Sequence, residues 1–191
     1  MTDVTICIPS IPPRKDMLTR AVTSVLEQTH PVAAVSVALD TRHDGAWTTR
    51  NRALAAVRTE WMGFLDDDDT LAPGHVAHLL ALAEEHSADV VWGWFEVNGG
   101  TDPFPHYRGR QYDRAQPHIV PITYMARTEL IHAAVAAMGG FQADDIGAWD
   151  NQDMPLLHAM LDLGARFQAS PVSTWYWNHH GSNTSGMPER W

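Results

Sequence analysis

The hydrophobic residues in the first half of the chain follow two alternating periods. Short apolar runs bounded by polar or proline-containing turns predict strands over residues 4–9, 34–39, 61–65 and 90–97. Between them, helical spacing of apolar residues predicts helices over residues 17–28 and 47–58, and another after Pro73. Strands that alternate with helices of this length imply an α/β fold, in which a mostly parallel central sheet has helices on both faces.

The second half of the chain has a weaker pattern. Residues 98–117 are rich in Gly, Pro, Tyr and Arg and predict a long loop, of a length typical of functional lids or disordered segments. A strand is expected over residues 118–125, and helices over 127–138 and 152–163. No repeat or linker interrupts the 191 residues, so we expect one domain over residues 1–191.

Composition narrows the function classes. A formal net charge of -10 argues against general binding to nucleic acids or acidic membranes. The sequence has no run long enough to span a bilayer and no signal-like N-terminus, which predicts a cytoplasmic protein. Cys7 is the single cysteine and lies in an apolar run, so we expect a buried thiol and no internal disulfide.

Acidic residues follow two of the predicted strands. Asp40 comes after the strand over 34–39, and four consecutive aspartates at 66–69 follow the strand over 61–65. Ligands of such sheets bind outside the carboxyl ends of the strands. Four adjacent carboxylates need a cation or hydrogen-bond donors, and carboxylate oxygens suit Mg²⁺ or Mn²⁺. The alternative is a solvated acidic turn in which Asp69 or Thr70 caps the next helix.

A series of short motifs runs along the whole chain. In order they are Ile8-Pro9-Ser10 with Arg14, Asp40 with Asp44-Gly45, Arg50-Asn51-Arg52, Asp66-Asp67-Asp68-Asp69, Gly139-Gly140-Phe141, Gln152-Asp153, and the aromatic-His-Gly-Ser-Asn segment over 175–185. Together they resemble a family-2 glycosyltransferase with a GT-A fold. The chain departs from the family pattern in two places: the segment before Arg14 is one residue longer, and Gln152 replaces an acidic residue.

The resemblance implies a Rossmann-like GT-A domain with a small antiparallel element on the acceptor side. Residues 1–97 would form the half that binds the nucleotide sugar, and residues 98–191 the half that binds the acceptor. The implied reaction is an inverting transfer of a sugar from a nucleotide-diphosphate sugar, with UDP-sugars favoured, to an acceptor hydroxyl. Mn²⁺ or Mg²⁺ would neutralise the charge that develops on the leaving group.

The resemblance also assigns roles to individual residues. Asp153 would be the catalytic base, and Asp68 would bind the metal together with His180 or, one position away, His179. Tryptophan rings stack on sugars, and Trp149 and Trp94 are the acceptor candidates. The residues assigned to the donor site are Ser10, Arg14, Asp40, Arg50, Asp66 and Asp67. Of the acidic run, Asp67 is expected to face solvent or to be structural.

Several of these roles have structural alternatives. Asp153 could merely stabilise a helix dipole, in which case Asp144, Asp145 or Asp150 could supply the base. Arg50 could pair with Asp40 or Asp44 instead of the donor.

Two other functions are weighed against sugar transfer. A nucleotide-sugar-binding protein without turnover is favoured by Gln152 alone, and a nucleotidyltransferase lacks support because no glycine-rich loop follows the first strand. The acceptor stays open between a glycan, a lipid-linked sugar, a protein and a small molecule. A homodimer in which residues 187–191 pack on the partner is a further expectation.

Overall fold

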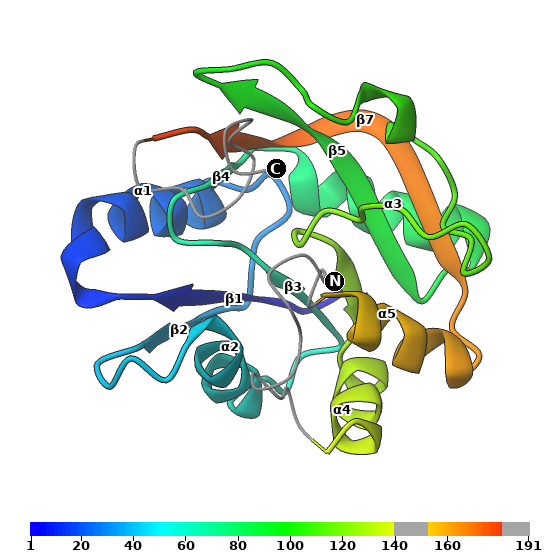
Figure 1. Cartoon of the computed structure of the whole chain (residues 1–191), viewed down its shortest axis with the longest axis horizontal. Coiled ribbons are helices and arrows are strands. Elements are labelled where there is room, and N and C mark those ends of the chain that lie inside the picture. Colours follow the sequence, from blue (N-terminus) through cyan, green and yellow to red (C-terminus); the bar gives the residue numbers. More distant parts are fainter. Residues whose placement is uncertain (140–152, 181–191) are drawn as a thin grey trace.

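A mixed sheet with helices on both faces forms the body of the protein (Figure 1). The computed structural model describes residues 1–139 and 153–180, with the side chain of Asp153 excepted. Its strands lie in the order β2-β1-β3-β6-β5-β7-β4. They are β1 (Val4–Ser10), β2 (Ala34–Leu39), β3 (Trp61–Phe64), β4 (Thr70–Leu71), β5 (Val90–Asn98), β6 (Met125–Arg127) and β7 (Phe167–Asn178).

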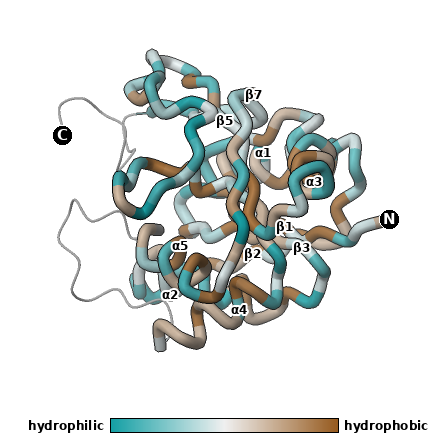
Figure 2. Tube along the Cα trace, turned by 90° about the vertical axis from the view of Figure 1, so that its right-hand side faces the viewer, coloured by the Kyte–Doolittle hydropathy of each residue, from teal (hydrophilic) through white to brown (hydrophobic). Residues whose placement is uncertain are grey.

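The helices cover the sheet from two sides. They are α1 (Lys15–Leu26), α2 (Ala46–Ala55), α3 (His75–His86), α4 (Thr128–Ala137) and α5 (Asp153–Asp162), with short 3₁₀ turns η1 (Pro12–Arg14) and η2 (Pro105–Tyr107). One hydrophobic cluster lies under α2, α4 and α5, and another lies under α1 and α3. Figure 2 shows these two groups of helices on opposite sides of β1 and β3.

Successive strand residues point to opposite faces of the sheet, so each strand contributes side chains to both hydrophobic clusters. Cys7 packs with the α2 side while Ile6 and Ile8 pack with the α1 side, and Trp92 and Val91 divide in the same way. The expectation that Cys7 is a buried thiol is confirmed, and burial raises its pKa to about 12. Within the described ranges, no helix combines the length and apolarity that crossing a membrane requires.

The sheet is mixed, which corrects the expectation of a mostly parallel one. β1 runs parallel to β2 and β3, and β5 runs parallel to β7. β6 runs antiparallel to both β3 and β5, and β4 runs antiparallel to β7. The physical reason is the connection: the chain passes from β5 to β6 through a loop and a 3₁₀ turn, without the crossover helix that parallel neighbours need.

The elements predicted for the first half are confirmed, whereas in the second half one predicted strand is largely absent and one long strand was not predicted. Of the strand expected over 118–125, only Met125 lies in a strand, β6; the buried His118, Val120 and Tyr124 belong to an irregular segment before it. The long strand β7 is missing from the predicted elements. Polar residues and Pro171 interrupt its apolar pattern, and its pairing with β5 shifts register in this region.

Gly93 lets β5 pass close to β7 at this register shift. A Cβ at position 93 would lie 2.4 Å from Thr174 Oγ1 and 2.9 Å from the carbonyl oxygen of Val172. We expect Gly93→Ala to lower the free energy of unfolding by about 1–3 kcal/mol through this overlap. Gly74→Ala is the control, because its Cβ would meet nothing within 4 Å. Urea denaturation measures both, and equal losses would contradict the role given to Gly93.

His75 links α3 to β7, since its Nδ1 lies 3.0 Å from Thr174 Oγ1. Burial lowers the pKa of His75 from 6.5 to about 4. Below pH 6.5 the unfolded chain takes up the proton and the folded chain does not, so stability present above pH 6.5 is lost as the pH falls toward 4. The loss approaches about 3 kcal/mol. Urea denaturation of His75→Gln should show a free energy of unfolding that falls less between pH 6.5 and pH 4 than in the wild type. An equal fall in both proteins would contradict this role of His75.

Candidate functional site

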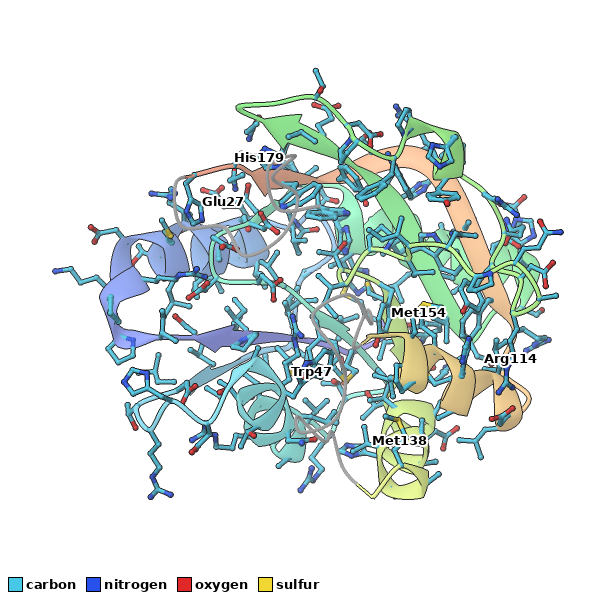
Figure 3. The ribbon with its side chains drawn as sticks, in the orientation of Figure 1. Glu27, Trp47, Arg114, Met138, Met154 and His179 are labelled. Carbon is cyan, nitrogen blue, oxygen red and sulfur yellow. The ribbon has the colours of Figure 1, made fainter. Side chains whose placement is uncertain are left out.

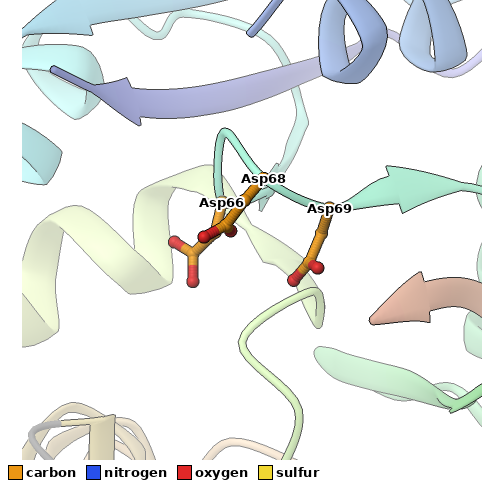
Figure 4. A group of neighbouring side chains, drawn as sticks. All are labelled: Asp66, Asp68 and Asp69. Carbon is orange, nitrogen blue, oxygen red and sulfur yellow. The ribbon is translucent and has the colours of Figure 1, made fainter. Parts of the chain in front are cut away.

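Asp66, Asp67, Asp68 and Asp69, here called the acidic turn, connect β3 to β4. The buried Leu65 precedes the turn, and the Asp69 N–H donates to the Asp66 carbonyl at 3.2 Å. The carboxylates of Asp66, Asp68 and Asp69 offer oxygens within 4.8 Å of one another and lie on the same side of the loop (Figure 4). Hard oxygen ligands this close together suit a divalent cation such as Mg²⁺ or Mn²⁺.

Asp67 points into the protein and anchors the turn. Its side chain is 3% exposed, so the expectation that it faces solvent is wrong and its structural alternative holds. One carboxylate oxygen accepts from Ser10 Oγ at 2.6 Å, and the other accepts from Arg14 Nη1 at 2.9 Å. The structure therefore joins three residues assigned to the donor site at the end of β1.

Asp68 is the meeting point of the turn with the C-terminal segment. Its Oδ2 lies 3.1 Å from Arg14 Nη1 and 3.1 Å from His180 Nε2. Burial, followed by the Asp66 carboxylate, raises the pKa of Asp68. A carboxyl group disfavoured as an anion in this way gains from a nearby positive charge.

The neighbouring histidine has a packing role. The His179 ring stands edge-on to Trp177 with centroids 4.7 Å apart, at the end of β7 (Figure 3). A Cβ at Gly100 would lie 2.9 Å from His179 Nδ1, so the Gly99-Gly100 turn leaves room for this ring. Of the two histidines considered from the sequence, His180 is the one beside Asp68; metal ligation itself stays a prediction.

Asp69 is buried at 4% exposure and accepts the Asn178 N–H at 2.8 Å. Burial, followed by the Asp66 carboxylate, raises the pKa of Asp69 well above its usual value. Thr70 begins β4, and α3 takes Gly74 as its N-cap. The alternative in which Asp69 or Thr70 caps that helix is therefore wrong.

Asn178 is a site residue that sequence reasoning missed. Besides its N–H bond to Asp69, its Nδ2 donates to the Asp68 carbonyl at 2.9 Å. Its Oδ1 accepts from Asn98 Nδ2 at 2.8 Å, which ties the last residue of β5 to the last residue of β7. The available signal was its position directly before the two histidines.

Arg50 and Asp40 lie on the other flank of the turn. Arg50 Nη2 is 2.7 Å from Asp66 Oδ1, and its guanidinium sits over the Trp47 ring at 4.6 Å. Asp40 and Asp44 instead lie 3.5 Å and 3.4 Å from Arg52 Nη2, so Arg52 forms the ion pairs with these aspartates that were expected as an alternative for Arg50.

The Asp40 carboxylate shapes the loop after β2. It accepts the N–H groups of Asp44 and Gly45 at 2.9 Å each and that of Arg42 at 3.3 Å. The bond from the Asp44 N–H lowers the pKa of Asp40, against the opposing effect of burial. Asp40 is thus held as an anion at the carboxyl edge of the sheet.

Trp94 belongs to the core, which corrects its assignment to the acceptor site. Its side chain is 0% exposed, its ring stacks on Phe95 at 4.7 Å, and its Nε1 donates to Asp102 at 2.7 Å. A ring without an exposed face cannot stack on a sugar. Several candidates lie outside the described residues, namely Trp149, Gln152, Asp144, Asp145 and Asp150. Asp153 is described only as the first residue of α5.

Solved structures share this fold. Crystal structures of S. aureus TarS 1-349 match with TM-scores of 0.73 for the complex with UDP and 0.76 for the complex with UDP-GlcNAc. The identities are 18% and 16%, and the matches cover 94% and 96% of this chain. They cover only 61% and 60% of the TarS chains, so this chain spans about three fifths of their length. At these identities the likeness concerns the fold.

A family model gives the second comparison, while the search of curated proteins found no match. The family is described as "Glycosyl transferase family 2", and its model matches residues 34–145. This stretch includes Asp40, Arg50 and the acidic turn, and it exceeds half of the chain. The chain therefore belongs to glycosyl transferase family 2.

Proposed function

We propose that the protein transfers a sugar from a nucleotide-diphosphate sugar to an acceptor hydroxyl, with inversion and with help from Mn²⁺ or Mg²⁺. The observation that carries the proposal is the group of three carboxylates at the end of β3. Family membership supports the reaction class. The TarS complexes with UDP and UDP-GlcNAc favour a UDP-sugar as the donor.

The charges around the acidic turn fit a divalent cation. Arg14 and Arg50 bring two positive charges to four carboxylates, which leaves two negative charges in excess when all four carboxylates are ionised and His180 is neutral. The raised pKa values of Asp68 and Asp69 have burial and carboxylate repulsion among their causes. Asp68, supported by Asp66, Asp69 and His180, would hold the ion. When bound, it would act as a Lewis acid toward the diphosphate leaving group.

The remaining residues would bind and orient the substrates. Asp40, fixed as an anion, would accept hydrogen bonds from the base or ribose of the donor. Arg50 is stacked on Trp47 and would offer its guanidinium to the base edge or the diphosphate. Asp153 at the start of α5 would take the proton of the acceptor hydroxyl.

The two halves assigned from the sequence would share the donor site. Residues 1–97 supply the acidic turn, while Asn178 and His180 from the other half contact it. The long loop and α5 would then form the acceptor side. A binding protein without turnover remains the second candidate because Gln152 replaces an acidic residue, and a turnover assay separates the two.

Donor binding tests the proposal first. With Mn²⁺, a panel of UDP-, GDP- and dTDP-sugars should include a donor that raises the melting temperature and slowly releases nucleoside diphosphate. Asp68→Asn should lose the metal-dependent part of both signals, whereas Asp162→Asn, an exposed aspartate on α5, should keep them. Absence of binding by any donor with metal present would sink the proposal.

A turnover assay distinguishes loss of the catalytic base from loss of donor binding. Asp153→Asn should keep metal-dependent donor binding and lose transfer, measured as sugar incorporation once an acceptor is found, or as donor hydrolysis before that. Full turnover by this variant would exclude Asp153 as the base. Donor binding by the wild type without any turnover would favour the binding protein.

Asn178→Ala probes the clamp between β7 and the acidic turn. The variant keeps the main-chain bond to Asp69 but loses the bond to the Asp68 carbonyl, so Asp68 should be less well oriented. We expect Mn²⁺ affinity to fall by about tenfold to a hundredfold, as for other residues that orient ligands. Calorimetric titration measures it. Asn98→Ala removes only the bond to the Asn178 side chain and should cause a smaller loss, and a loss as large as that of Asn178→Ala would contradict the clamp.

A further inference from the structure

Arg14 already occupies the carboxylate that is assigned to the metal. It is the last residue of η1, at the start of α1, and reaches across to the acidic turn. Its Nη1 lies 2.9 Å from Asp67 Oδ1 and 3.1 Å from Asp68 Oδ2, so one atom bridges two carboxylates. Arg14 is therefore an internal counter-cation of the acidic turn.

The contacted oxygen of Asp68 is crowded. Its Oδ2 lies within hydrogen-bond distance of both Arg14 and His180, at 3.1 Å each. A metal ion would need an oxygen at about 2.0–2.2 Å, and a positive charge a few ångströms away opposes such binding. Arg14 and a divalent cation therefore compete for the same negative charge.

The two arginines of the site differ in how freely they can turn. Arg50 is 9% exposed and stacked on Trp47, which fixes its position. Arg14 is 22% exposed, and its anchor Asp67 is held separately through the other oxygen by Ser10. If the head group of Arg14 leaves Asp68, Asp67 therefore keeps a hydrogen-bond donor in Ser10.

We propose that Arg14 opposes divalent metal binding until the donor arrives, and then turns from Asp68 to the donor diphosphate. The inference rests on the proposed function and adds an order to it: metal alone binds weakly, and metal and nucleoside diphosphate bind cooperatively. Because such coupling is reciprocal, the metal strengthens nucleotide binding by the same factor as the nucleotide strengthens metal binding.

The test measures Mn²⁺ affinity by the electron paramagnetic resonance signal of the free ion, with and without UDP. Arg14→Gln removes the charge and keeps a donor for Asp67. It should bind Mn²⁺ about tenfold more tightly than the wild type without UDP, and the gain caused by UDP should shrink by about the same factor. Arg14→Lys keeps the charge and should stay nearer the wild type. Arg52→Gln, which removes an arginine paired with Asp40 and Asp44, should change the affinity by less than about twofold.

The outcomes separate this inference from the proposed function. If the wild type binds Mn²⁺ and Arg14→Gln binds it equally or more weakly, the inference is overturned and the proposed function stands. If none of the proteins binds Mn²⁺, both the inference and metal assistance fail. If Arg14→Gln does not fold, the Arg14 Nε–H resonance of the wild type decides: a shift on adding Mg²⁺ with UDP that clearly exceeds the shift with Mg²⁺ alone supports the inference, and an unmoved resonance, or one that moves as far with Mg²⁺ alone, overturns it.

Discussion

Repulsion among four consecutive carboxylates is the constraint on which the rest of the site depends. The chain offsets this repulsion by giving each carboxylate partners from other parts of the chain. Asp66 pairs with Arg50 of α2, and Asp67 pairs with Ser10 of β1 and Arg14 of η1. Asp68 meets His180, and Asp69 accepts the N–H of Asn178 at the end of β7. Parts of the sheet distant in sequence thus converge on one turn.

This convergence explains why the mixed sheet matters for function. In a parallel sheet with its strands in sequence order, the acidic turn would lie near the end of β1 but far from the C-terminal strand. The antiparallel insertion of β6 and the pairing of β5 with β7 bring the C-terminal strand to the same edge. β4 continues directly from the acidic turn and pairs with β7, opposite Trp175 and Tyr176. The proposed donor site therefore depends on contacts between the acidic turn and the C-terminal strand.

The sequence predicted the parts of the site that follow from local pattern. Apolar runs located the first strands, and their ends located Asp40 and the acidic turn at one edge of the sheet. The inward direction of Asp67 could not be predicted, because it depends on Ser10 and Arg14 meeting it across the sheet. Trp94 was assigned from its residue type, whereas its strand position places the ring in the core. Asn178 donates its main-chain N–H to the Asp69 carboxylate and its side-chain Nδ2 to the Asp68 carbonyl, and residue type does not reveal these partners.

The central claim is that the acidic turn holds a divalent cation that meets the diphosphate of the donor. Crystals grown with Mn²⁺ and UDP test it through the anomalous scattering of manganese. We predict an anomalous peak at bonding distance from an Asp68 carboxylate oxygen, with a phosphate oxygen of UDP on the same ion. UDP bound at the edge of the sheet without a peak beside Asp68, or a peak away from the acidic turn, would contradict it.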